Sequence, residues 1–153
     1  MKRWAAAPRR GHTPADEPLA AALAAEEAAI YAYGVIGVRL GGDGDRTEAR
    51  AAEQVHRERR DYLVGALKQL PASPAGYELP FPVTDRASAL RLAIQVEDGV
   101  AQAWRPVLPV TRDAQRNTAL SAMVDAAVRA TRWRRRAGVT PVTLAFPGRV
   151  TTP

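Results

Sequence analysis

Apolar residues recur every three to four positions along four segments of the chain, and this spacing predicts four amphipathic helices. The helices are expected near residues 16–40, 45–70, 85–105 and 112–137. Glycine or proline follows each of the first three segments, at Gly41, Pro71 and Pro106. These residues end helices. The sequence contains no convincing strand pattern and no internal repeat, so it predicts an all-α protein.

The helix starts are predicted from side chains that can cap free backbone N–H groups. Asp16 is the expected N-cap of the first helix, with Pro18 in the first turn, where its missing N–H is harmless. Asp45 and Glu48 together suggest a capping box for the second helix. Thr84 or Asp85 can cap the third helix, and Thr111 the fourth.

The lengths of the connections predict the topology. Short connections between the first and second helices, and between the third and fourth, favour two antiparallel hairpins. Residues 71–84, which contain four prolines, can extend over about 45 Å, whereas a helix of ~20 residues is about 30 Å long. This connection can therefore cross the whole bundle, which allows the second and third helices to be parallel.

Carboxylates interrupt two of the apolar stripes. Glu26 is central in the stripe of the first helix, Glu97 is central in that of the third, and His56 is central in that of the second. A carboxylate that faces a core costs several kcal/mol unless a cation or a hydrogen-bond donor meets it. These three side chains are therefore expected to point into the bundle, whereas Asp125 of the fourth helix is expected to face solvent.

Three short motifs resemble the metal-binding helices of ferritins. Glu26 followed by Tyr31 and Tyr33 resembles the first-helix motif, Glu53-Gln54-Val55-His56 resembles the Glu-x-x-His motif, and the segment from Glu97 to Gln102 resembles the third-helix motif. The resemblance implies Glu26, Glu53, His56 and Glu97 as metal ligands, and iron or manganese as the metal. It also implies a ferritin-like four-helix bundle in which one long crossover joins two antiparallel hairpins.

Residues 16–149 as a whole resemble a family of ferritin-like proteins of unknown function from actinobacteria. The resemblance is carried by Tyr-Ala-Tyr-Gly in the first helix, by Arg59-Arg60-Asp61, by Tyr77-Glu78-Leu79-Pro80 and by Ala145-Phe146-Pro147-Gly148. No activity can be carried over from that family.

The fourth helix departs from the di-iron pattern. Such sites take a carboxylate from this helix, but the inward stripe expected here holds no residue that binds a hard metal ion. Its members are Ala119, Leu120, Met123, Ala126, Ala127, Ala130 and Thr131. The sequence thus predicts a degenerate metal centre.

Two interpretations of the inward polar residues remain open. In the first, Glu26, His56 and Glu97 hold one or two metal ions. In the second, they form a buried charge network that Arg60, Tyr31 or Tyr33 completes. Arg60 is favoured there, because an antiparallel hairpin that turns near residue 43 puts residue 59 or 60 level with Glu26, while His56 is displaced by about 5 Å. Glu53 is expected to pair with Arg57, four positions later.

Composition narrows the choice of function. The chain has no cysteine, which excludes disulfides and thiolate chemistry. Its net charge of +6 equals the six arginines after Val128, which are the only charged residues there. Arg129, Arg132 and Arg136 are expected to line one outward stripe with Asp125, which is usually a solvated face but could contact the phosphates of nucleic acid.

We therefore expect a flexible arm at residues 1–15, a bundle at 16–138 and a proline-punctuated tail at 139–153. The expected role is non-catalytic, structural or in interaction, and no cofactor is expected. The alternatives are a di-iron or di-manganese oxidase or ferroxidase, and a basic protein associated with RNA or the ribosome. Alanine-rich helix faces favour a homodimer. We expect a cytoplasmic protein, because the longest apolar stretch, 19–40, contains Glu26 and Glu27 and is not expected to span a membrane.

Overall fold

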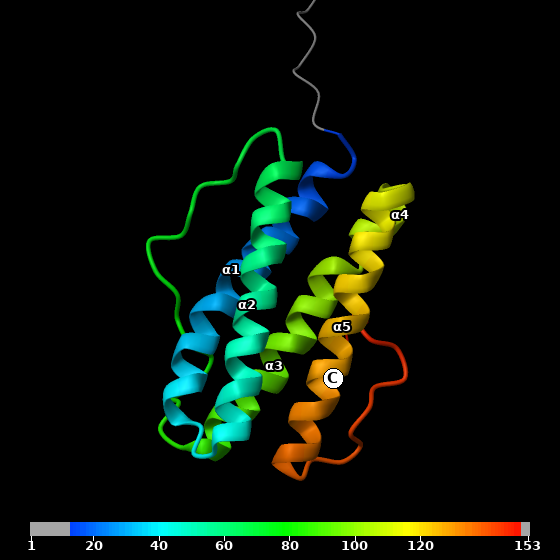
Figure 1. Cartoon of the computed structure of the whole chain (residues 1–153). Helices are drawn as coiled ribbons and strands as arrows, with labels where there is room; N and C mark the ends of the chain where they lie inside the picture. The colour runs from blue at the N-terminus through cyan, green and yellow to red at the C-terminus, as the bar shows by residue number, and fades with distance from the viewer. Residues whose placement is uncertain (1–12, 151–153) are drawn as a thin grey trace, which may run out of the picture.

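The chain folds into four long helices and one short helix, and its computed structural model describes residues 13–150. The helices are α1 (Asp16–Arg39), α2 (Asp43–Ala66), α3 (Arg86–Trp104), α4 (Val107–Val110) and α5 (Asp113–Ala137). The long helices pack side by side as a bundle (Figure 1). No strand occurs between residues 13 and 150. The predicted all-α bundle is confirmed, and most of the expected N-terminal arm lies outside the described residues.

The bundle consists of two antiparallel hairpins joined by one crossover. In Figure 1, α1 runs downward and α2 upward, and α3 then runs upward before α5 returns downward. The connection between α2 and α3 passes from one end of the bundle to the other, so these two helices are parallel. The topology predicted from the length of this connection is confirmed.

The helix boundaries follow the capping chemistry only in part. Asp85 begins α3 with a capping box, since its side chain accepts a hydrogen bond from the Ser88 N–H at 2.8 Å. The capping box expected at Asp45 is wrong. α2 begins two residues earlier, and Asp45 binds Arg86 and Arg136 instead. The cap expected at Thr111 is also wrong, because its hydroxyl donates to the Val107 carbonyl and ends α4.

Small residues let the long helices approach one another closely. α1 packs against α2 and α3, and α3 packs against α5. Alanines line these contacts and are almost fully buried, among them Ala22, Ala29, Ala93, Ala122 and Ala126. Long polar side chains join α2 to α5, where Arg132 and Arg136 each approach Glu48 at 3.4 Å. The helices therefore lie close together where alanines line their contacts, whereas the contact between α2 and α5 is polar.

The crossover is an extended strap that alternates in exposure. Tyr77, Leu79, Phe81 and Val83 are buried or half-buried, whereas the residues between them are exposed. Leu79 and Phe81 pack against the apolar core, and the guanidinium of Arg91 lies 4.2 Å from the centre of the Phe81 ring. Every second residue thus attaches the strap to the bundle.

α1 is long and apolar enough to cross a membrane, judged by length and composition alone. Core helices of soluble proteins pass the same test, and 44% of the most apolar window of α1 is buried inside the bundle. The charged Glu26 lies fully buried in its middle. In this fold α1 is a packed bundle helix, and the cytoplasmic location remains a prediction.

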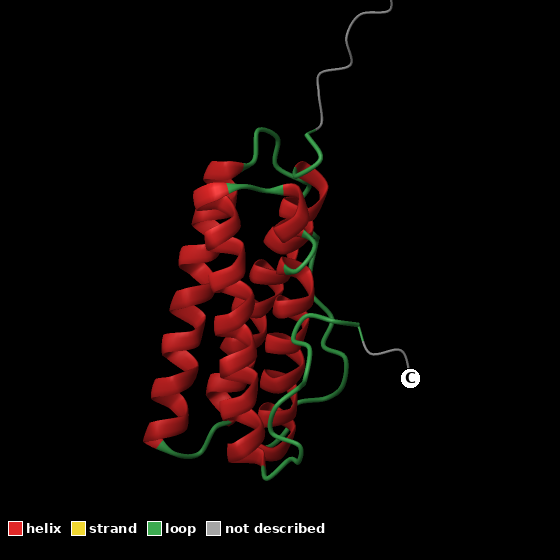
Figure 2. Ribbon diagram, turned by 90° about the vertical axis from the view of Figure 1, so that its right-hand side faces the viewer, coloured by secondary structure: helices red, strands yellow, loops and turns green. Residues whose placement is uncertain are grey.

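The tail after α5 turns back along the outside of the bundle (Figure 2). Two glycines with positive φ shape it, Gly138 (φ 69°) at the end of α5 and Gly148 (φ 74°) farther on. A Cβ added at Gly148 would lie 2.6 Å from the carbonyl oxygen of Ala101, whereas one added at Gly138 would meet nothing within 4 Å. Gly148 therefore allows the tail to touch the backbone of α3.

Gly148→Ala should detach the tail from α3. The new Cβ would clash with the Ala101 carbonyl, and an alanine in the left-handed backbone conformation costs a further ~1–2 kcal/mol. Gly138→Ala is the matched control, since it carries the conformational cost without the clash. Amide hydrogen exchange should show loss of protection near Ala101 and residues 145–150 only in Gly148→Ala. Equal protection in the two variants would contradict the proposed contact.

Candidate functional site

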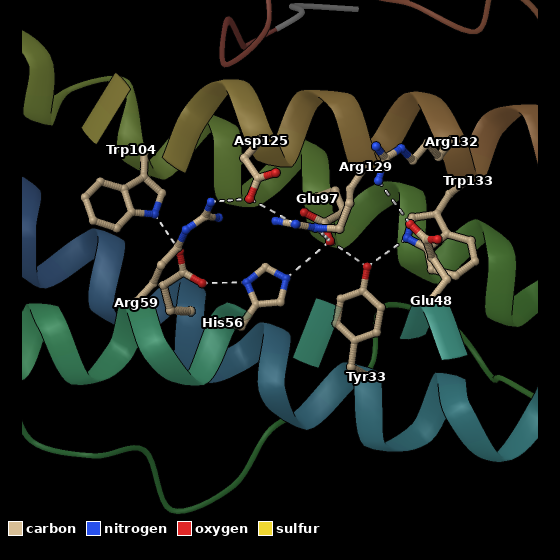
Figure 3. Close-up of polar contacts among 11 residues, drawn as sticks. Tyr33, Glu48, His56, Arg59, Glu97, Trp104, Asp125, Arg129, Arg132 and Trp133 are labelled. Atoms are coloured by element: carbon tan, nitrogen blue, oxygen red, sulfur yellow. Dashed lines mark hydrogen bonds and ion pairs between the residues drawn. The ribbon is translucent and has the colours of Figure 1, made fainter. Parts of the chain in front are cut away.

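Three inward side chains meet at the centre of the bundle. Glu26, His56 and Glu97 are all fully buried. The Nδ1 atom of His56 lies 2.5 Å from Glu26 Oε2, and its Nε2 atom lies 3.2 Å from Glu97 Oε1 (Figure 3). The imidazole thus bridges carboxylates from α1 and α3, and the predicted inward orientation of all three residues is confirmed.

Aromatic donors add further hydrogen bonds to this cluster. The indole N–H of Trp104 donates to Glu26 Oε1 at 2.5 Å, and the hydroxyl of Tyr33 donates to Glu97 Oε1 at the same distance. Trp133 in turn donates to the Tyr33 oxygen at 2.8 Å. Buried tyrosine and tryptophan side chains normally find such partners. These aromatic side chains therefore hold the carboxylates in fixed orientations.

The arginine that meets Glu97 comes from α5. Arg129 is buried, and its Nε donates to Glu97 Oε1 at 2.9 Å. The prediction that Arg60 would neutralise the cluster is wrong, because Arg60 is part-exposed and binds its neighbour Asp61 at 2.7 Å. The prediction from the axial level also fails, because His56 of α2 is the residue that contacts Glu26.

The expected outward position of Arg129 is wrong because the phase of α5 differs from the prediction. The buried stripe of this helix is Ala119, Ala122, Ala126, Ala130 and Trp133, together with Arg129 and Arg134. Leu120, which was expected inside, is 46% exposed. The alanines spaced three and four residues apart before Trp133 indicate the observed phase in the sequence. The larger apolar residues beside them favour the other phase.

A second layer of charge surrounds Arg129. Its Nη1 donates to Asp125 at 3.0 Å, and Asp125 also binds Arg59 of α2. Asp125 was expected to face solvent, and its side chain is 45% exposed. It is therefore half-exposed and fixed by two guanidinium groups. Acidic and basic groups alternate from Glu26 through His56, Glu97, Arg129 and Asp125 to Arg59, and we call these six residues the charge network.

The charge network lies between two apolar clusters. One contains Leu23, Leu63 and Trp104, and the other contains Ile36, Leu90 and Trp133. Three of its atoms are buried without a hydrogen-bond partner, namely Glu97 Oε2, Arg129 Nη2 and Arg59 Nη1. The inner members of the network, from Glu26 to Arg129, are buried, so the ion pairs among them are stronger than at the surface.

Glu53 and Tyr31 lie apart from the charge network. Glu53 accepts a hydrogen bond from Arg57 at 2.5 Å, as the sequence alternative predicted. It lines a separate cavity of about 270 Å³ between α1 and α2. Tyr31 stacks on Tyr77 of the strap, with ring centres 5.2 Å apart. Of the four candidate metal ligands, the fold brings together Glu26, His56 and Glu97 only.

The donor set does not fit a metal ion. Among residues 13–150, no group of three or more His, Asp or Glu side chains is arranged to hold one. Glu26 Oε1 and Glu97 Oε1 already accept bonds from N–H or O–H donors, and the guanidinium of Arg129 contacts Glu97 where a cation would lie. Arginine has no lone pair to offer a metal. The arrangement is suited to internal charge compensation.

Three further arginines after Val128 also have acidic partners. Arg132 binds Glu48, Arg134 binds Asp98, and Arg136 binds both Asp45 and Glu48. These carboxylates come from α2 and α3. The basic stripe expected from the sequence is therefore interleaved with acidic residues, which lowers its attraction for phosphates.

The charge network shifts the pKa of its members. Burial lowers the pKa of His56, but hydrogen bonds and charges from Glu26 and Glu97 outweigh it and raise the pKa above 6.5. Burial raises the pKa of Glu97, but His56, Arg129 and Tyr33 together lower it below 4.5. Both shifts favour the charged forms of His56 and Glu97.

Arg129→Ala should destabilise the protein by about 3–5 kcal/mol, because it leaves the buried Glu97 carboxylate without its cation. Arg132→Ala is the matched control on the same helix. It removes an exposed pair with Glu48 and should cost less than about 1 kcal/mol. Urea unfolding measures both. Similar losses in the two variants would contradict the central role of Arg129.

Stability should fall at both ends of the pH range. The raised pKa of His56 contributes stability that is fully present below its unfolded value near 6.5 and is lost as pH rises through the folded value. The lowered pKa of Glu97 contributes stability present above 4.5 and lost as pH falls. Urea unfolding from pH 3 to 10 tests this, and His56→Gln should flatten the alkaline limb. An unchanged alkaline limb would rule out His56 as its source.

Comparisons with known proteins place the chain in a family. Its residues 18–151 match the domain of unknown function DUF4439. The chain is 39% identical to a conserved hypothetical protein, Rv2844, from Mycobacterium tuberculosis. The crystal structure of that protein superposes on this chain with a TM-score of 0.75. The match covers 88% of this chain and 97% of the mycobacterial one. No curated protein matches. The similarity to ferritins remains a prediction, and the chain belongs to the DUF4439 family.

Proposed function

We propose that this chain is a non-catalytic bundle of ferritin-like ancestry in which an internal ion-pair network replaces a metal centre. Its role would then be to present its surface and cavities to other molecules. The observation that carries this proposal is the bond from Arg129 Nε to Glu97 Oε1 at 2.9 Å. A permanent side-chain cation stands there in place of a metal.

Electrostatics supports the proposal. A divalent ion bound by Glu26, His56 and Glu97 would have to displace a proton from His56 and would face the positive charge of Arg129 at close range. The raised pKa of His56 makes that proton harder to remove, and a protonated imidazole cannot bind a metal. Arginine cannot lose its proton in proteins. Both effects weaken metal binding.

The charge network also accounts for the carboxylates without catalysis. Each carboxylate of the inner cluster has a partner from another helix, so removal of one partner would leave a buried charge. No substrate channel is needed for that role. The expected homodimer remains part of the proposal, but the most buried alanines, such as Ala22 and Ala126, pack within the bundle and lend it no support.

Protein purified without chelator from cells supplied with iron and manganese should contain far less than one metal ion per chain. The reason is that Arg129 and the His56 proton occupy the positions that a metal would need. Elemental analysis by mass spectrometry measures the content, and oxygen consumption with ferrous iron tests for oxidase turnover.

Glu97→Ala and Glu53→Ala provide the matched comparison. Stoichiometric metal that is lost in Glu97→Ala and kept in Glu53→Ala would overturn the proposal and favour a metal-dependent oxidase. Metal lost in Glu53→Ala as well would mean that the site rearranges to include that residue, and this too would overturn it.

A further inference from the structure

A cavity of about 240 Å³ lies under the strap, between α1 and α3. No member of the charge network lines it. Its α1 wall is mostly alanine, including Ala25, Ala28 and Ala32, and its α3 wall includes Val96 and Gly99. These small side chains leave room beneath Leu79 and Pro80 of the strap. The cavity is therefore a feature separate from the bundle centre.

The volume and the lining of the cavity suit a small apolar group. Ligand sites are concave and mostly apolar, with a few polar groups that fix orientation. A cavity of about 150 Å³ lined by apolar residues holds benzene, so this one can hold an aromatic ring with a short substituent. Two of the lining side chains, Gln95 and Glu78, carry an amide or a carboxylate group.

The rim of the cavity is acidic and aromatic. Tyr31 and Tyr77 stack with ring centres 5.2 Å apart and both line the cavity, as does Glu78. Glu27 is close enough to act on Tyr77, whose pKa is raised by burial and then by that carboxylate. None of the lining residues is basic. The carboxylates and the tyrosine ring faces both favour a cation at this rim. The same carboxylates repel a ligand that carries a carboxylate.

We propose that this cavity binds a small aromatic amine. Its ring lies between the alanine wall of α1 and the strap, and its ammonium group lies at the rim near Glu78 and the two tyrosines. The inference is independent of the proposed loss of the metal centre, because it rests on different residues.

Three probes of similar size separate the contributions of shape and charge. They are 2-phenylethylamine, 2-phenylethanol and phenylacetate, studied by calorimetry and by thermal shift with the full chain. The amine should bind with a sub-millimolar dissociation constant, the alcohol more weakly, and the anion at least about tenfold more weakly than the amine.

Gly99→Leu should fill the cavity and weaken binding of the amine and the alcohol at least about tenfold. A Cβ at Gly99 meets nothing within 4 Å, so the new side chain has space to enter. Gly65→Leu is the matched control, because this helical glycine of α2 is equally open and does not line the cavity. Glu78→Gln should weaken the amine several-fold and leave the alcohol unchanged.

The proposal is overturned if the amine does not bind saturably to the unaltered chain, or if the alcohol binds more tightly than the amine. It is equally overturned if phenylacetate binds as tightly as the amine, or if Gly99→Leu and Gly65→Leu bind alike. Should Gly99→Leu fail to fold, as judged by its melting curve, Ala25→Leu fills the same cavity from α1 and replaces it in the comparison.

Discussion

One carboxylate oxygen joins all four long helices. Glu97 Oε1 on α3 lies within hydrogen-bonding distance of Tyr33 from α1, His56 from α2 and Arg129 from α5. A buried anion requires such partners, since its desolvation is otherwise uncompensated. The rotation of each helix about its axis is therefore restricted by a polar contact as well as by apolar packing. The flanking apolar clusters then exclude water from these bonds.

The sequence indicates the parts of this arrangement that depend on local periodicity. Glu26, His56 and Glu97 each interrupt an apolar stripe, so their inward direction follows from the helical repeat alone. The parallel course of α2 and α3 follows from the length of the strap. Both kinds of inference need only the spacing of residues within one element or the number of residues in one connection.

The partner of Glu97 could not be predicted in the same way. Arg129 follows Val128 on a helix rich in both alanine and arginine, so two phases about one residue apart are nearly equal in apolar content. Packing of α5 within the bundle, which buries Ala126 and Trp133, selects the phase that turns Arg129 inward. The strap cavity likewise depends on which sides of α1 and α3 the strap crosses. Tertiary contacts decide both.

The arrangement of the charge network has a consequence for how the chain folds. Glu26 and His56 belong to the first hairpin, and Glu97 and Arg129 belong to the second. Each hairpin thus carries one acid and one base that can meet before the two halves associate. None of these four buried groups then has to dock as an uncompensated charge, and the pair that joins the two hairpins, Arg59 and Asp125, is partly exposed. The order of assembly that this favours is local pairing first, with the His56 contact to Glu97 closing the bundle last.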